Sequence, residues 1–294
     1  MIKASQVKEL REKTGAGMMD CKKALSATDG DIEKAIDWLR EKGIAKSAKK
    51  AGRIAAEGLS RVAVDGNTAV LLEVNSETDF VAKNDKFLHL LDLVQAALLS
   101  GKPADVEAAL ALDTPEGTIN DLIINATATI GEKISFRRFQ VVEKAEDEIF
   151  GAYMHKGGTI SALVVLKGGD EAIAKNIAMQ VASMSPVYAT EKDIPAAELD
   201  HERELQKQMM DADPKMAGKP EKVLAGILNG KVKKHFKELC LADQEFFLEN
   251  KKSVSQYLKE QGASVVSFVR YQVGEGIEKK EEDFAAEVAA QIKG

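Results

Sequence analysis

Apolar residues recur every three or four positions through residues 1–54, which predicts three short helices. Ser5 is expected to cap the first helix, whose apolar side contains Val7 and Leu10. The glycines of Thr14-Gly15-Ala16-Gly17 end this helix, and Asp29-Gly30-Asp31 ends the second and caps the third. The pattern therefore predicts a helical first domain with a limited core.

This first domain, residues 1–54, resembles the ubiquitin-associated three-helix fold. Its third helix contains the single tryptophan, Trp38. After Gly43 the composition turns to Ala and Lys, so residues 45–53 are expected to form either a polar linker or an exposed helix.

Residues 55–143 are expected to form a first core unit in which strands and helices follow one another. The sequence Asp65-Gly66-Asn67 lies between two apolar runs and predicts a tight hairpin turn. Gly101 is expected to close the first helix of the unit. The expected elements are strands at 59–64, 69–74 and 134–142 and helices at 84–99 and 116–130.

A related second unit is expected over residues 144–273, beginning with a hairpin of strands at 151–155 and 160–166 and a helix at 171–184. The stretch Phe268–Glu275 matches Phe136–Glu143 at five of eight positions, 132 residues apart. Duplication of one α+β unit explains the shared Arg, Gln and Glu. Chance similarity between two amphipathic strands is the alternative.

The second unit is longer because a helical hairpin is inserted at about residues 187–230. A charged helix over 196–210 is followed by Asp213-Pro214 and Gly218-Lys219-Pro220, and a second helix with a narrow apolar stripe runs on to Leu239. The pattern is compatible with oligomer or partner contacts and equally with packing on its own domain, so the sequence leaves open a homodimer formed through this hairpin.

A C-terminal module is expected over residues 274–294, with a last amphipathic helix at 283–292. Its apolar positions Phe284, Val288 and Ile292 must dock on this chain or on a partner. The predicted fold class is therefore α+β, with a helical head, a duplicated core, an inserted hairpin and a terminal helix.

Charge is uneven along the chain, whose net charge is −6. A basic head on an acidic body fits an acidic protein partner or RNA, and solvated helix faces are the plain alternative. The acidic body argues against a dedicated nucleic-acid binder. No apolar run reaches the length of a membrane span, the N-terminus shows no apolar signal core, and two cysteines stand far apart, so we expect a cytoplasmic protein with free thiols.

Motifs for bound nucleotide or for catalysis are missing from the sequence. There is no Gly-x-x-x-x-Gly-Lys-Ser/Thr loop, no Gly-x-Gly-x-x-Gly after a strand, and no Gly-x-Ser-x-Gly elbow. The four histidines share no metal-ligand spacing. We therefore expect no cofactor, no metal site and no catalytic centre.

Two segments stand out once catalytic motifs are set aside. An apolar strand leads into Thr78-Asp79-Phe80-Val81, an acidic and aromatic group at a strand–helix junction. Phe80 could form an exposed wedge, or it could tuck into the local core as a helix staple. Met18 and Met19 follow the glycines of the head, where they could form an adaptable recognition surface or belong to the core.

These two segments carry a resemblance to a known family. Thr14 to Leu25 with Asp29-Gly30-Asp31-Ile32, and Glu73-Val74-Asn75 with Thr78 to Ala82, resemble two signatures of the elongation factor Ts family. Val273 to Lys279 and Asp283 to Val288 resemble its C-terminal module. The resemblance spans essentially the whole chain, although the inserted hairpin matches in type and place more than in sequence.

The resemblance implies a guanine nucleotide exchange factor that binds elongation factor Tu in its GDP form and promotes GDP release. Thr78, Asp79, Phe80 and Val81 would dislodge the partner's Mg²⁺, with Phe80 as a wedge and Asp79 acting beside the metal and phosphates. Further contacts are expected at Met18, Met19, Phe284 and His155, although Met154 and Lys156-Gly157-Gly158 depart from the family pattern around that histidine.

Two other classes of function stay open at this point. An adaptor would hold partners through the ubiquitin-associated-like head without any effect on nucleotide. An enzyme would need a pocket that gathers titratable residues from distant parts of the sequence.

Overall fold

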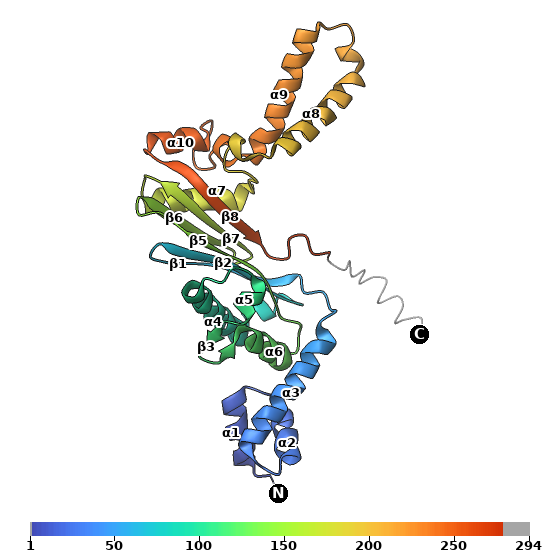
Figure 1. Ribbon diagram of the computed structural model, residues 1–294, viewed down its shortest axis with the longest axis vertical. Coiled ribbons are helices and arrows are strands. Elements are labelled where there is room, and N and C mark those ends of the chain that lie inside the picture. The colour runs from blue at the N-terminus through green and yellow to red at the C-terminus, as the bar shows by residue number, and fades with distance from the viewer. Residues whose placement is uncertain (1, 279–294) are drawn as a thin grey trace.

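The computed structural model describes residues 2–278, in which a helical head, a two-sheet body and a projecting helical hairpin follow one another along the long axis of the molecule (Figure 1). The fold class is α+β, as predicted. The described chain ends at Glu278, so the predicted helix at 283–292 and its Phe284 lie outside the described residues.

Three helices form the head: α1 (Ala4–Thr14), α2 (Met18–Ala27) and α3 (Ile32–Lys50). They enclose a small core centred on Leu10 and Leu25. Asp31 caps α3 by accepting a hydrogen bond from the Lys34 amide at 3.1 Å, as expected. The capping role given to Ser5 is wrong: Lys3 is the N-cap of α1, because the Gln6 side chain reaches back to the Lys3 amide at 3.0 Å.

The Ala/Lys-rich stretch after Gly43 continues α3, so the exposed-helix alternative holds as far as Lys50. Gly43 itself is buried against the next domain. A Cβ atom at this position would lie 3.6 Å from the Ala128 side chain. The missing side chain lets α3 pass close to a core helix and docks the head on the body.

The first sheet has the order β1-β2-β5, and both of its pairings are antiparallel. Its turn at Gly66-Asn67 lies where predicted. The first helix of the unit, α4, ends at Gly101, as expected, but the left-handed conformation that follows it belongs to Lys102, with φ 43°, and Gly101 lies against the Leu112 side chain. The elements of this unit are β1 (Glu57–Asp65), β2 (Thr68–Ser76), η1 (Val81–Lys83), α4 (Asp85–Gly101), α5 (Val106–Leu110), β3 (Asp113–Thr114), β4 (Gly117–Thr118), α6 (Ile119–Ile130) and β5 (Ser135–Glu143).

The second sheet repeats this design with the order β6-β7-β8. Thr68 and Ile160 each open a middle strand, and they pair with Glu143 and Gln272. Gln272 therefore takes the place of Glu143, three residues from the alignment by sequence identity, which matched Glu143 with Glu275. The elements here are β6 (Glu148–His155), β7 (Ile160–Lys167), α7 (Glu171–Met184), α10 (Val254–Glu260) and β8 (Ser264–Gln272).

The two arginines that the matching stretches share lie near one carboxylate. Arg138 and Arg270 each lie 3.5 Å from the Glu275 carboxylate. The shared side chains thus meet at one junction between the sheets, although they do not occupy equivalent positions of the two strands.

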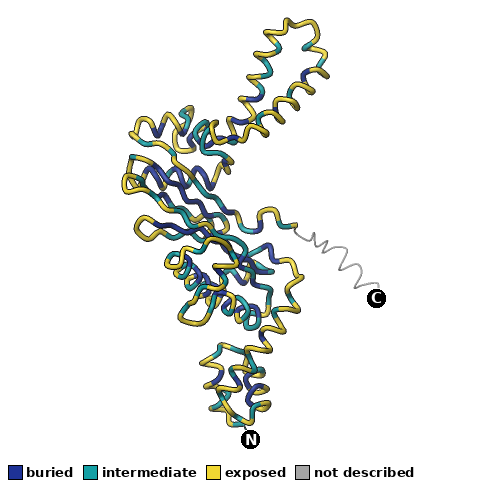
Figure 2. The backbone as a smooth tube through the Cα atoms, in the orientation of Figure 1, coloured by how far each residue is buried: buried dark blue, intermediate teal, exposed yellow. Residues whose placement is uncertain are grey.

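The two sheets pack face to face, and helices cover the outer face of each (Figures 1 and 2). Leu72 of β2 faces α4 and α6, whereas its neighbour Leu71 faces Leu163 of the other sheet. Val164 of β7 faces α7. Both middle strands are therefore buried on two sides, which explains why they read as continuous apolar runs.

The inserted hairpin consists of α8 (Ala196–Asp211) and α9 (Glu221–Leu239). Short 3-10 turns accompany it: η2 (Glu191–Asp193), η3 (Pro214–Met216) and η4 (Leu241–Asp243). Its apolar cluster lies at the base, around Ile194, Val232 and Phe236, and the tip projects away from the body (Figure 1). None of the helices in residues 2–278 is apolar and long enough to span a bilayer.

Candidate functional site

Phe80 lies in the turn between β2 and α4, and its side chain is 80% exposed. The next residue, Val81, is 5% exposed and belongs to the core of the first unit. The staple interpretation of Phe80 is therefore wrong, because Val81 fills the core position. Two backbone hydrogen bonds close the turn. The Lys83 amide donates to the Phe80 carbonyl at 3.2 Å, and the Asn84 amide donates to the Val81 carbonyl at 2.9 Å.

Thr78 fixes the start of this turn. Its amide donates to Oε2 of Glu132 at 2.9 Å and its hydroxyl donates to Oε1 at 2.7 Å. Its carbonyl accepts a hydrogen bond from the Ser76 hydroxyl at 2.9 Å. On the other side, the Asn84 side chain caps α4 by accepting from the Lys86 amide at 2.9 Å. The turn is thus bounded by satisfied hydrogen bonds on both sides, and Phe80 projects from between them.

Asp79 is exposed beside Phe80. Within residues 2–278 no side chain forms an ion pair with it, so its carboxylate faces water. A negative charge next to an exposed aromatic ring is an arrangement that can act on a cationic or metal-containing site of a partner.

Met18 and Met19 open α2 and are 60% and 62% exposed, so the core interpretation of this pair is wrong. The glycine loop before them touches the body: the Gly15 carbonyl accepts a hydrogen bond from Nζ of Lys86 at 2.8 Å. Lys86 lies in the first turn of α4, shortly after Phe80. The methionine pair and the Phe80 turn therefore belong to neighbouring segments of the structure.

Glu73 is a buried acid of β2 that belongs to one of the quoted signatures but was given no role from the sequence. Its carboxylate accepts hydrogen bonds from Arg137 (2.9 Å), Arg138 (2.6 Å), Asn75 (3.0 Å) and the Gly274 amide (2.9 Å). Burial alone would raise the pKa of Glu73, but the hydrogen bonds from Gly274, Asn75 and the two arginines outweigh it and lower the pKa. On β2, the strand that leads to Phe80, this carboxylate thus joins β5 to the segment that follows β8.

Comparison with known families decides between the open classes. The family model described as elongation factor Ts matches residues 77–275, and the model of the N-terminal part of mitochondrial elongation factor Ts matches residues 1–51. The chain belongs to the elongation factor Ts family. Among its relatives, elongation factor Ts of Limosilactobacillus reuteri is 52% identical over 291 residues, 99% of each chain. That of Levilactobacillus brevis is 53% identical over 294 residues, 100% of this chain and 99% of its own.

Membership of the elongation factor Ts family implies a nucleotide exchange factor that binds elongation factor Tu in translation elongation, and not an enzyme with a reaction of its own. Residues 2–278 contain no cluster of His, Cys, Asp and Glu that could hold a metal ion. Within the family framework, the exposed Phe80 turn lies at the start of the matched region.

His155 lies at the end of β6, far along the chain from the Phe80 turn, and its ring nitrogen Nδ1 is 3.1 Å from the Tyr153 hydroxyl. In the described part of the chain, no hydrogen bond or ion pair joins His155 to the Phe80 turn. The loop before Met18 and Met19 thus touches α4 through Gly15 and Lys86, whereas His155 lies on the second sheet.

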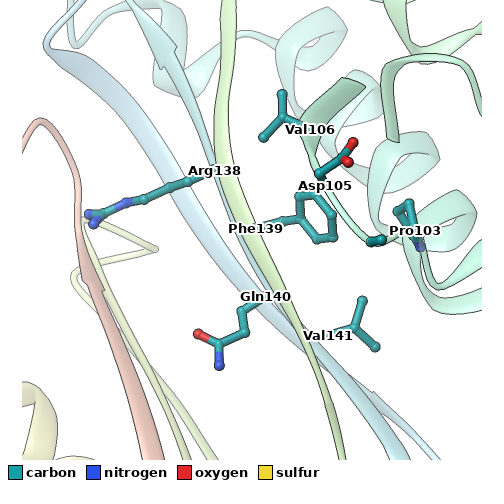
Figure 3. A pocket seen from close by; sticks show the side chains of 8 residues that line it. Pro103, Asp105, Val106, Arg138, Phe139, Gln140 and Val141 are labelled. Atoms are coloured by element: carbon teal, nitrogen blue, oxygen red, sulfur yellow. The ribbon is translucent and has the colours of Figure 1, made fainter. Parts of the chain in front are cut away.

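A groove of about 500 Å³ runs along β5, between this edge strand and the loop Pro103–Val106 (Figure 3). Phe139 and Val141 point toward the loop, whereas Arg138 and Gln140 point to the other side of the strand (Figure 3). None of the site residues predicted for this elongation factor Ts family member lines the groove. Its two charged lining residues have structural partners, since Asp105 caps α5 and Arg138 pairs with Glu73, so the groove gives no support to the enzyme alternative.

Proposed function

We propose that this protein binds elongation factor Tu in its GDP form and accelerates GDP release by pressing the Phe80 turn against the Mg²⁺ and phosphate site of the partner. The observation that carries this proposal is the 80% exposure of Phe80 on a turn whose two sides are fixed. A large apolar side chain held in water is unfavourable unless a partner covers it. The exposed carboxylate of Asp79 lies next to it.

The physics of nucleotide binding supports such a role. A GTPase holds GDP largely through its phosphates, by Mg²⁺ and by backbone amides of a phosphate loop. A wedge that shifts these groups removes several charge-assisted contacts at once. Phe80 would enter an apolar gap of the partner, and Asp79 would repel or displace the groups that hold the metal.

The coupling between GDP binding and factor binding sets a second requirement for an exchange factor. If the factor weakens GDP binding by a given ratio, GDP weakens binding of the factor by the same ratio. Several weaker contacts therefore help the factor to stay bound while the site opens. Met18 and Met19 of the head are proposed to supply one such contact, and His155 and Phe284 are predicted to supply others.

Three further statements about this protein stay proposals. We expect it to act in the cytoplasm and to bind no nucleic acid directly. A homodimer through the α8–α9 hairpin is testable from the mass of the protein in solution, in which twice the chain mass of 31.8 kDa would support it.

The function is tested by following release of a fluorescent GDP from elongation factor Tu in a stopped-flow instrument. Release is expected to accelerate with increasing concentration of this protein, and excess GDP is expected to displace the factor from immobilised elongation factor Tu. An adaptor would bind equally with and without GDP and would leave the release rate unchanged. That pair of results would overturn the proposed function.

A further inference from the structure

Two carboxylates join the Phe80 turn to the loop between α6 and β5 in a reciprocal way. Glu132 accepts hydrogen bonds from the amide and hydroxyl of Thr78, at 2.9 and 2.7 Å. In the opposite direction, Glu77 accepts a hydrogen bond from the Lys133 amide at 2.5 Å. Two adjacent residues of each segment thus bind two adjacent residues of the other. We name Glu77, Thr78, Glu132 and Lys133 the carboxylate clasp.

The clasp also holds the end of helix α3. Nη1 of Arg53 lies 3.3 Å from each carboxylate oxygen of Glu77, and Nζ of Lys133 donates to the Arg53 carbonyl at 2.8 Å. Nζ of Lys50 donates to the carbonyl of Gly131, the residue before Glu132. Three segments that are distant in the sequence, at 50–53, 77–78 and 131–133, therefore meet at one place.

The clasp lies where it can control Phe80. Thr78 precedes Phe80 by two residues, and a single carboxylate holds both its backbone and its side chain. Glu77 is only 21% exposed and Glu132 is partly buried, so water competes less for these hydrogen bonds than it would at an open surface. On the far side of Phe80, Val81 is anchored in the core. Because Thr78 is held on one side of Phe80 and Val81 on the other, rotation of the turn is restricted.

We propose that Glu132, supported by Glu77, is a positioning residue that presents Phe80 to the partner in the orientation needed to open its nucleotide site. This inference rests on the proposed function, because it assigns a role only if Phe80 acts as the wedge. The same contacts fix the end of α3 relative to the turn, so the head and Phe80 would reach the partner in one fixed geometry.

A double-mutant cycle tests this role. The limiting rate constant of GDP release from elongation factor Tu is measured with the wild type, Glu132→Gln, Phe80→Ala and the double variant. Each Thr78 donor binds its own oxygen of Glu132, and Gln replaces one of these oxygens by an NH2 group, so one donor of Thr78 loses its acceptor in this geometry. In the presence of Phe80, Glu132→Gln is expected to reduce the rate constant by about tenfold. In the Phe80→Ala background the same change is expected to have less than about a twofold effect.

A matched control is Glu116→Gln, which removes the charge of an exposed glutamate in the same unit, 2.8 Å from His89, and is expected to leave the rate constant unchanged. If Glu132→Gln does not fold, as judged by circular dichroism, Thr78→Val takes its place, because it removes the hydroxyl donor and keeps the amide.

The possible outcomes are distinguishable. A tenfold effect that disappears without Phe80 supports the positioning role. An equal effect in both backgrounds, or no effect in either, overturns it while the proposed function stands, provided that Phe80→Ala itself slows release. A wild-type rate constant for Phe80→Ala overturns the proposed function and this inference together.

Discussion

Phe80 and Val81 are consecutive residues of one turn, yet the Phe80 side chain is 80% exposed and the Val81 side chain is 5% exposed. The chain therefore separates binding from stability within two adjacent positions. Val81 anchors the turn in the core of the first unit, and Phe80 is left free for a partner.

Truncation at these two positions is expected to have very different effects on the free energy of unfolding. Val81→Ala removes two buried methyl groups and should lower the free energy of unfolding by about 2 kcal/mol. Phe80→Ala removes a ring that is mostly in water and should change it by less than about 0.5 kcal/mol. Urea denaturation followed by circular dichroism measures both values. A loss for Phe80→Ala as large as that for Val81→Ala would show that the ring packs on the protein.

Gly274 is expected to be far less tolerant of a side chain than Gly276, although both have left-handed backbone, with φ 73° and 75°. A Cβ atom on Gly274 would lie 2.1 Å from the Ala56 carbonyl oxygen, whereas no atom of residues 2–278 lies within 4 Å of one on Gly276. Gly276→Ala should destabilise the fold by about 1 kcal/mol from backbone strain alone. Gly274→Ala should lower the free energy of unfolding by at least about 3 kcal/mol, since backbone atoms must move to make room for the Cβ atom. Similar denaturation midpoints for the two variants would contradict this account of the junction.

Glu73 is expected to make stability depend on pH. Its pKa is lower in the folded chain than its ordinary value of 4.5, because four hydrogen-bond donors outweigh the effect of burial. A lowered pKa contributes stability that is present above the unfolded value and is lost as the pH falls through the folded value. Glu73→Gln removes the charged partner of Arg137 and the closer of the two charged partners of Arg138, and should reduce the free energy of unfolding by about 3 kcal/mol at neutral pH.

The measurement for Glu73 is the difference in unfolding free energy between the wild type and Glu73→Gln across a pH series. That difference should be constant above about pH 5.5 and should shrink below about pH 4.5, because there the unfolded wild type takes up a proton at Glu73 that the folded wild type does not yet bind. Glu143→Gln serves as the control, since Glu143 pairs with Lys102 at a side-chain exposure of 65% and should give a small difference at every pH. If the difference in unfolding free energy between the wild type and Glu73→Gln grew as the pH fell, it would contradict a lowered pKa for Glu73.

Much of the fold could be predicted from periodicity. The helix expected at 171–184 is α7 with the same bounds, and the turn at Gly66-Asn67 lies where the pattern placed it. The segment between α9 and β8 was not predicted. Its buried residues, such as Phe246 and Val254, are too widely spaced in a short stretch to reveal a period, and they are ordered by packing on α7.

Less of the site could be predicted. A Phe at a strand–helix junction can point to the core or to water with the same local pattern, and the choice depends on whether Val81 fills the core. Glu132 follows the Gly131 cap of α6 as an ordinary polar loop residue, 54 positions from the Thr78 that it binds. Glu73 looks like a polar member of an apolar strand until β5 and Gly274 supply three of its four donors. Hydrogen bonds between segments that are distant in the chain leave no periodic pattern in the sequence.

The most direct test of the wedge is the limiting rate constant of fluorescent GDP release from elongation factor Tu at saturating Phe80→Ala protein. Leu248→Ala is the matched control, because Leu248 is another exposed apolar residue, at 52%, on the second unit. We expect Phe80→Ala to lower the rate constant by at least about tenfold, as for a residue at the centre of a contact, and Leu248→Ala to leave it unchanged. Release as fast with Phe80→Ala as with the wild type would contradict the central claim.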